Sequence, residues 1–225
     1  MYARTVDDEV LTFAVSGMLW KKSLVMIDEE SESLWSHLLG RAMQGEFKGH
    51  KLERLPSELT NWKTWQQQHP DTTVAVMKRS SNTYRKDFYK KPQRYVIGYN
   101  KGEQARAWGY ADLIKQPVVN DQLGKEALLV IFNADTISAT IYDRKVDGKM
   151  LAFEQQGKVL TDRETGRQWD PLSGKMIGEE KASKRLNRLP GVVSYTKAWK
   201  KFYPHSTYWG QQSESVMPNR KPVLK

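Results

Sequence analysis

Residues 2–13, Tyr-Ala-Arg-Thr-Val-Asp-Asp-Glu-Val-Leu-Thr-Phe, recur in altered form at residues 142–153, Tyr-Asp-Arg-Lys-Val-Asp-Gly-Lys-Met-Leu-Ala-Phe. Tyrosine, arginine, valine, aspartate, leucine and phenylalanine keep their register at an offset of 140 residues. A repeat with so long a period governs the architecture, because each copy is one structural unit. The sequence therefore predicts two copies of one module within its 225 residues.

The repeat resumes after a short gap at an offset of 134 residues. We expect residues 2–76 to superpose on residues 142–209, with the gap between Gly17 and Asp28. Side chains needed in both copies are expected to be scaffold, so polar ones found in one copy are the better functional candidates. The aligned pairs are Asp28/Asp162, Trp35/Trp169, Gly40/Gly174, Leu52/Leu186, Arg54/Arg188, Trp65/Trp199 and Pro70/Pro204.

Each copy is predicted to end in one short aromatic helix. The aligned residues Thr60 and Ser194 are good helix N-caps. A proline ends each segment, because the residue before a proline disfavours helical geometry. The aromatic side chains recur on one helix face and are expected to be core. We predict that the aligned indoles of Trp65 and Trp199 are buried equivalents.

The rest of each copy is predicted to be short strands. Copy two has an additional front part, with a hairpin over 95–108 and buried strands over 126–132 and 137–142. Copy one has no counterpart to it. The fold class is therefore α+β and mainly β, with two tandem homologous modules of which the first is incomplete. We expect the modules to pack about a pseudo-twofold axis, because half a sheet in copy one would expose strand edges.

One turn is expected to differ between the copies. The turn that starts at Asp162 ends at Gly166, which adopts left-handed geometry without steric cost. Copy one has Glu32 at that position. We therefore expect the turn of copy one to be more strained or differently shaped.

These patterns divide the chain into four segments. Residues 1–77 are the incomplete module, 78–94 a basic linker, 95–209 the complete module and 210–225 a disordered tail. Residues 78–94 contain seven cations, one aspartate and interleaved aromatic side chains. Such a segment can bind phosphates and stack on bases. We favour the linker, and expect any nucleic-acid binding by residues 78–94 to be weak, non-specific and salt-sensitive.

Composition excludes several classes of function. The formal net charge is +10 and cysteine is absent, so disulfides, thiolate catalysis and cysteine-bound metals are excluded. The four histidines are too scattered for a zinc site, so we expect no metal and no cofactor. No apolar run approaches the ~18 residues of a membrane-spanning helix. The start lacks the features of a signal peptide. As written, the chain is therefore expected to be soluble, without an export signal of its own.

The sequence also resembles a known prokaryotic family. The residues that carry the resemblance are Leu11–Asp28, Ser33–Ser36, Gly40–Ala42, Arg54–Pro56, Trp62–Trp65 and His69–Thr72, then Gly102–Ala107, Val119–Asp121 and Asp162–Gly166. Together they resemble the domain-of-unknown-function family 3179 over nearly the whole chain up to Trp209. The resemblance implies a tandem organisation and an extracytoplasmic setting.

The departures from this family concern its cysteines. The family usually carries Cys-Pro-Leu-Cys just upstream of the point that corresponds to residue 1. In copy two that position reads Asn133-Ala-Asp-Thr136, and Lys115-Gln116 stand where the family has Trp-His. We therefore expect an N-terminally shortened member without the thiol or metal ligands of the family.

Two sets of polar residues are candidate sites. Ser16, Asp28 and His37 supply the chemical types of a catalytic triad, although no Gly-x-Ser-x-Gly elbow is present. Ser16, Ser36, His37 and Arg41 are candidates for binding a polar or anionic ligand, with Arg41 as a fork for a carboxylate.

The predicted function is non-catalytic binding or scaffolding outside the cytoplasm, with an unknown small ligand or protein as partner and no membrane span. One alternative is a hydrolase-type enzyme with a site near Ser36, His37 and Arg41. The other is weak nucleic-acid binding through residues 78–94. A cavity that gathers His37 and Arg41 favours a ligand or an enzyme, and a continuous basic face favours nucleic acid.

Overall fold

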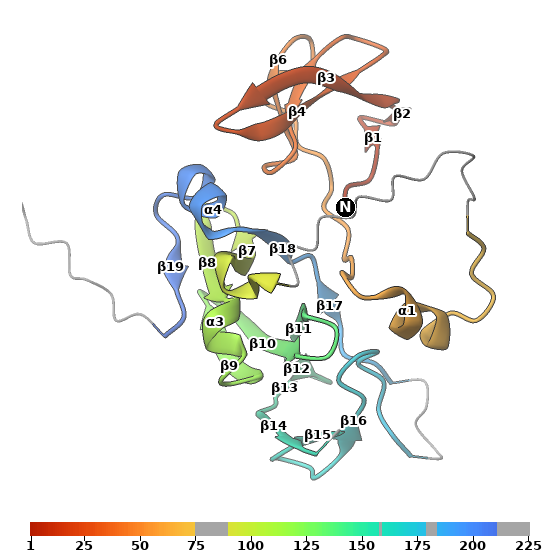
Figure 1. Cartoon of the computed structure of the whole chain (residues 1–225), viewed down its shortest axis with the longest axis vertical. Coiled ribbons are helices and arrows are strands. Elements are labelled where there is room, and N and C mark those ends of the chain that lie inside the picture. The colour runs from red at the N-terminus through yellow and green to blue at the C-terminus, as the bar shows by residue number, and fades with distance from the viewer. Residues whose placement is uncertain (75–89, 158, 179–183, 211–225) are drawn as a thin grey trace, which may run out of the picture.

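The computed structural model describes residues 1–74, 90–157, 159–178 and 184–210 (Figure 1). These residues form a mainly β fold with a few short helices, which confirms the predicted fold class. Most of the predicted linker, residues 78–89, and the predicted tail beyond Gly210 lie outside the described residues. Within those ranges, no helix is both long and apolar enough to cross a membrane.

The first module consists of two antiparallel sheets and one helix. β1 and β2 form a short hairpin, and β3 to β6 follow one another in a four-stranded sheet. The elements are β1 (Thr5–Val6), β2 (Glu9–Val10), β3 (Phe13–Trp20), β4 (Ser23–Asp28), β5 (Leu34–Ser36), β6 (Arg41–Gln44) and α1 (Trp62–Gln68).

The second module begins with the part that module one lacks. Its elements are η1 (Pro92–Arg94), β7 (Tyr95–Lys101), β8 (Gln104–Gly109), α3 (Tyr110–Leu113), β9 (Val118–Leu123), β10 (Glu126–Asn133) and β11 (Ser138–Asp143). The repeated part follows, with β12 (Lys145–Val146), β13 (Lys149–Met150), β14 (Phe153–Gln156), β15 (Val159–Asp162), β16 (Gln168–Trp169), β17 (Arg188–Leu189), β18 (Val192–Tyr195), α4 (Thr196–Phe202) and β19 (Thr207–Tyr208).

Module two is built in layers, so that both faces of its central strands are buried. One sheet has the order β18-β7-β8-β19 and the other the order β17-β11-β10-β9. Alternate side chains of β7 and β10 meet in a core between the sheets, which includes Ile97 and Val130. The outer face of β7 packs on Trp199 of α4, and the outer face of β10 packs on the β14-β15-β16 sheet through Leu129. Burial on both faces explains the near-continuous apolar run of β10.

The structure confirms the internal repeat in its hydrogen bonds. The buried indole of Trp35 donates from Nε1 to Asp28 Oδ2 at 2.7 Å, and Trp169 donates to Asp162 Oδ2 at 3.0 Å. The Tyr2↔Arg54 bridge recurs as the pair Tyr142↔Arg188 in β11 and β17. Two further strand pairings recur in the same way. Trp35↔Ala42 corresponds to Trp169↔Met176, and Arg41↔Lys51 corresponds to Lys175↔Arg185.

The gap between the copies lies in one hairpin. Phe13 pairs with Asp28 and Phe153 pairs with Asp162, so the β3–β4 hairpin is six residues longer than the β14–β15 hairpin. Its tip reaches α4 of module two (Figure 1). The rings of Trp20 and Phe202 meet edge to face at 5.0 Å, and Lys21 Nζ donates to the carbonyl oxygen of Lys201 at 3.0 Å.

Helix α1 of module one and the β14–β15 hairpin of module two border the same hollow. Gln67 of α1 and Gly157 of the hairpin are among the residues that line it. Packing of the modules about a pseudo-twofold axis stays a prediction.

Helix α1 corrects two predictions. Trp199 is buried but Trp65 is not, and α1 has no buried residue. The physical reason is that α4 lies on the β7–β8 sheet, while module one has no such sheet. Both N-caps lie one residue after the predicted Thr60 and Ser194. In α1 the N-cap is Asn61, whose side chain accepts from Thr64 N. In α4 the N-cap is Tyr195, which forms no side-chain cap bond.

The strained turn is present, and its relief gives a testable prediction. Glu32 has φ +55° where Gly166 has φ +69°. Left-handed backbone geometry destabilises the folded state by roughly 1–2 kcal/mol for a residue other than glycine. Against this, glycine lowers the free energy of unfolding by about 0.4–1 kcal/mol, because it gives the unfolded chain more conformational freedom. We expect Glu32→Gly to raise the free energy of unfolding by about 0.5–1 kcal/mol in urea titrations. Glu32→Ala, which keeps the strain, is the control and should not stabilise.

Candidate functional site

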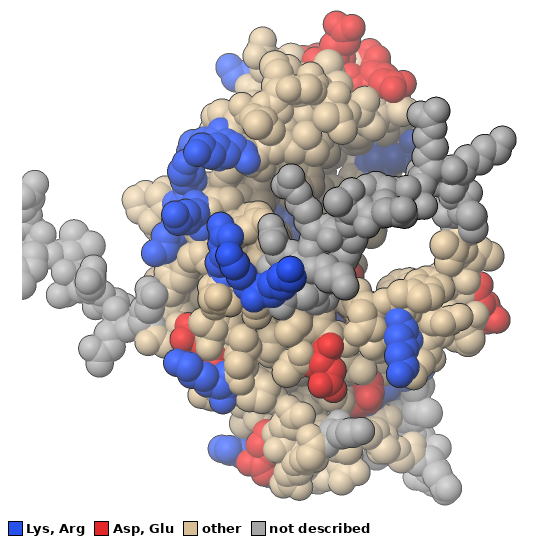
Figure 2. Space-filling model, in the orientation of Figure 1, with Lys and Arg blue, Asp and Glu red and all other residues tan. Residues whose placement is uncertain are grey.

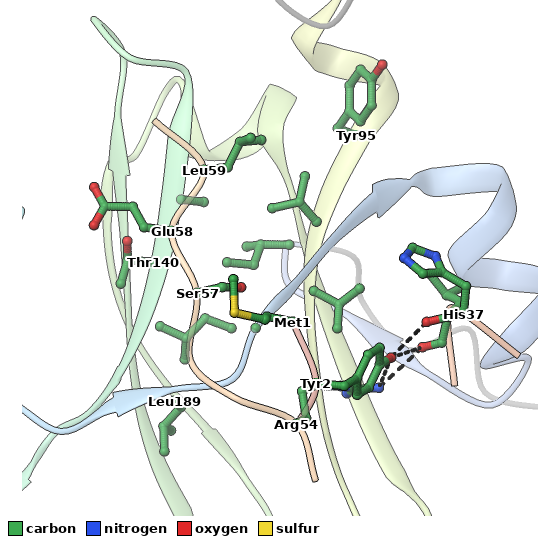
Figure 3. A pocket seen from close by; sticks show the side chains of 17 residues that line it. Met1, Tyr2, His37, Arg54, Ser57, Glu58, Leu59, Tyr95, Thr140 and Leu189 are labelled. Atoms are coloured by element: carbon green, nitrogen blue, oxygen red, sulfur yellow. Dashed lines mark hydrogen bonds between the residues drawn. The ribbon is translucent and has the colours of Figure 1, made fainter. Parts of the chain in front are cut away.

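The candidate site is a cavity of about 350 Å³ between the two modules. Module one contributes Tyr2, His37 and Arg54, which lie together at one end (Figure 3). Module two contributes apolar side chains of β7, β11 and β18, such as Ile97. A mostly apolar cavity with a few polar groups at one end is the usual form of a small-molecule site.

Arg54 is the charged group at this end, and its side chain is held from both modules. Nη1 donates to Asn100 Oδ1 at 2.6 Å, and Nη2 donates to the hydroxyl of Tyr203 at 3.3 Å. Nη2 also bonds the Leu38 carbonyl oxygen at 3.3 Å, and the guanidinium lies over the ring of Tyr2. These bonds fix the position of the guanidinium without neutralising its charge.

The equivalent arginine of module two shows what Arg54 lacks. Arg188 Nη1 binds Glu58 Oε2 at 2.8 Å, and the Glu58 side chain is only 7% exposed. Arg54 forms no ion pair with any carboxylate among the described residues, and its Nε is buried without a hydrogen-bond partner there. Glu58 also lines the cavity, but its charge is already matched by Arg188. The cavity therefore has one cationic end.

The neighbouring titratable groups leave this charge uncompensated. Burial raises the pKa of Tyr2 above its usual value, so its hydroxyl stays protonated and donates to the carbonyl oxygen of His37 at 2.9 Å. Burial lowers the pKa of His37, so its imidazole is neutral at pH 7. The guanidinium of Arg54 therefore keeps a positive charge at this end of the cavity that neither neighbouring side chain compensates.

The four predicted ligand residues do not all line the cavity. His37 does, whereas Ser16, Ser36 and Arg41 are absent from its lining. The hydroxyl of Ser16 donates to the Val25 carbonyl oxygen at 2.7 Å, and Ser36 Oγ accepts from the Leu39 amide. Arg41 is exposed on β6. A ligand role for these three stays a prediction.

Two of the three triad residues, Ser16 and Asp28, are engaged elsewhere. Asp28 accepts from Ser31 at Oδ1 and from Trp35 at Oδ2. In the described part of the chain, neither His37 nor Ser16 hydrogen-bonds Asp28. Arg54 was missed because its match with Arg188 assigned it to the scaffold. The signal that could have found it is Glu58, which in the aligned module is Val192.

The family described as protein of unknown function, DUF3179, matches residues 1–92 and matches again over residues 86–206. The chain belongs to this family. The two DUF3179 segments coincide with the repeat, and the second begins close to the additional strands of module two. No curated protein and no solved structure matches the chain.

At the DUF3179 cysteine position of module two, the side chains form a turn. Asn133 Oδ1 accepts from the amides of Asp135 and Thr136 at 2.9 and 3.0 Å. Among the described residues, no group of three or more His, Asp or Glu side chains is placed to hold a metal ion.

Proposed function

We propose that this DUF3179 protein is a non-catalytic binding protein that holds a small anionic molecule in the cavity between its modules. The observation that carries the proposal is Arg54, a partly buried guanidinium that lines the cavity without a carboxylate partner. A buried charge is costly when it is unpaired. A carboxylate or phosphate group is the ligand chemistry that offsets this cost.

Binding is favoured over hydrolysis by the hydrogen bonds of the candidate groups. Ser16 and Ser36 bond the backbone, and Asp28 bonds Ser31 and Trp35. A nucleophile needs a base within hydrogen-bond reach. The extracytoplasmic setting implied by the resemblance remains part of the proposal.

The proposal predicts different effects for two arginines. In calorimetric titrations against a panel of small dicarboxylates, phosphate and sugar phosphates, the wild type should bind at least one member. Arg54→Gln should weaken that binding about tenfold or more, the loss of one charge-assisted contact. Arg41 is an exposed arginine on β6, and Arg41→Gln should leave the affinity unchanged. Thermal melts should show that both variants fold.

The imidazole of His37 supplies an independent readout. Its NMR titration midpoint should lie below the ordinary value of about 6.5 in the free protein. An anion bound beside it should raise that midpoint, because a negative charge favours the imidazolium. Equal loss of affinity in Arg41→Gln, or a His37 midpoint unmoved by a bound anion, would contradict the site.

A further inference from the structure

Six exposed cations from three separate parts of the chain gather on one face of the molecule. Figure 2 shows a blue band that runs from the tip of the β3–β4 hairpin over α4 to η1. Its residues are Lys21, Lys22, Arg94, Lys197, Lys200 and Lys201, all of them exposed. None of the six forms an ion pair with a carboxylate within the described ranges.

The band is acid-free because of how the strands pair. Residues 88–102 and 181–210 contain neither aspartate nor glutamate. These two segments are brought together where β18 pairs with β7 and α4 follows β18. The hairpin tip then adds two lysines through its contact with α4. The positive potential of the face therefore arises from the fold and not from one run of charge.

The internal repeat shows that four of the six cations occur in one copy only, whereas Lys197 is matched by Lys63. Lys200 and Lys201 correspond to Gln66 and Gln67 of α1 at the offset of 134. Lys21 and Lys22 lie in the hairpin extension that module two lacks. Features that occur in one copy have no role in the shared fold. Here they converge at a single place.

An aromatic ring lies within the band. Tyr195 is 48% exposed, with its inner face stacked on Tyr95 at 4.5 Å. The guanidinium of Arg94 lies 5.8 Å from the centre of the Tyr195 ring. A supported, exposed ring among cations is the kind of platform on which single-stranded bases stack.

The position of the exposed apolar side chains argues against the band being a membrane-docking surface. Val15 and Leu19 are 70% and 71% exposed. They lie opposite Met26 and Leu24, so both are on one face of the hairpin, while Trp20 on the other face contacts α4. A membrane-docking surface presents its apolar groups together with its cations. Here Val15 and Leu19 lie on the hairpin face opposite Trp20, and Trp20 is the residue that contacts α4, the helix that carries three of the lysines.

We propose that this band binds the phosphate backbone of single-stranded nucleic acid, with a base stacked on Tyr195 and without sequence preference. None of the six cations of the band lines the cavity of Arg54. The band is also distinct from residues 78–89, which are outside the described part of the chain. Binding is electrostatic, so its strength falls steeply as salt rises.

The test uses fluorescence anisotropy of the full chain with a labelled oligothymidylate at 50 and 200 mM salt. Lys197, Lys200 and Lys201 are changed together to glutamine. Binding at 50 mM salt should weaken about tenfold or more, and the slope of log affinity against log salt should fall by about 2, at about 0.7 per lost phosphate contact. The charge-matched control changes Lys63, Lys145 and Lys149, exposed lysines outside the band, and should bind like the wild type.

Tyr195 separates nucleic acid from other polyanions. Tyr195→Ala should weaken oligothymidylate binding about fivefold or more while leaving binding of inorganic polyphosphate unchanged, and Tyr195→Phe should restore it. No binding at 50 mM salt, or equal loss in the control triple variant, would overturn the proposal. It is also overturned if Tyr195→Ala has no effect, or if vesicles of anionic phospholipid bind more tightly than the oligonucleotide.

Discussion

Replacing Trp199 with alanine should lower the free energy of unfolding by about 3–5 kcal/mol, the range for truncating a buried tryptophan. The indole is fully buried, stacked on Tyr203 at 4.1 Å and bonded from Nε1 to Ser206 Oγ at 3.0 Å. It also lies directly on Gly98, where a Cβ atom would overlap the ring. Its removal leaves a cavity between α4 and the sheet that the backbone cannot fill.

The chain supplies a matched control at the aligned position. Trp65 makes the same local contacts, with its Nε1 bonded to Thr72 Oγ1 at 3.0 Å and its ring 4.2 Å from that of His69. It has no counterpart of the β7–β8 sheet on which Trp199 packs. Trp65→Ala should therefore cost only about 1 kcal/mol. Chemical denaturation of both variants measures the difference, and equal losses would show that α1 is packed as tightly as α4.

The second large effect concerns the buried carboxylates that hold the aligned indoles. Asp28 and Asp162 are both fully buried, and each accepts from a tryptophan Nε1 and from a hydroxyl and an amide three residues on. Asparagine at either position turns one acceptor into a donor. Either the indole N–H or the backbone amide three residues on is then left without an acceptor, so Asp28→Asn and Asp162→Asn should each cost about 2–4 kcal/mol.

Asp28 also predicts a change in acid stability. Burial alone would raise the pKa of this carboxyl, but the hydrogen bonds from Trp35 and Ser31 outweigh it and leave the pKa lowered. A lowered pKa in the fold contributes stability that is present above the unfolded value of about 3.9 and is lost as pH falls through the folded value. Urea titrations between pH 5 and 2 should therefore show a shallower pH dependence for Asp28→Asn than for wild type. An unchanged slope would contradict the assignment.

The repeat made most of the fold predictable from sequence. Shared residues such as Trp35 and Trp169 identified equivalent strands, and Glu32 identified the strained turn before its φ was known. The exposure of Trp65 could not be read from its own helix, because burial depends on a sheet that another part of the chain must supply. The cap positions shifted by one because Asn61 and Thr60 are both good caps, and local sequence does not choose between them.

The site was harder to predict than the fold. Ser16 and Ser36 were candidates because of their hydroxyls, yet these hydroxyls bond backbone groups. Arg54 is present in both copies, so repeat comparison set it aside. Arg54 is distinguished by its surroundings: Arg188 pairs with the carboxylate of Glu58, and Arg54 has no such partner among the described residues. That asymmetry arises from how the modules pack against each other, which the alignment does not contain.

The contact between Lys21 and Lys201 has a consequence for how the protein is made. The two residues are 180 positions apart in the chain. At roughly 5–20 residues per second of synthesis, the hairpin emerges on the order of 10–40 s before the helix that covers Trp20. The N-terminal module thus leaves the ribosome with an aromatic tip and an edge strand uncovered. Slow translation or early release of the chain then favours association between nascent chains.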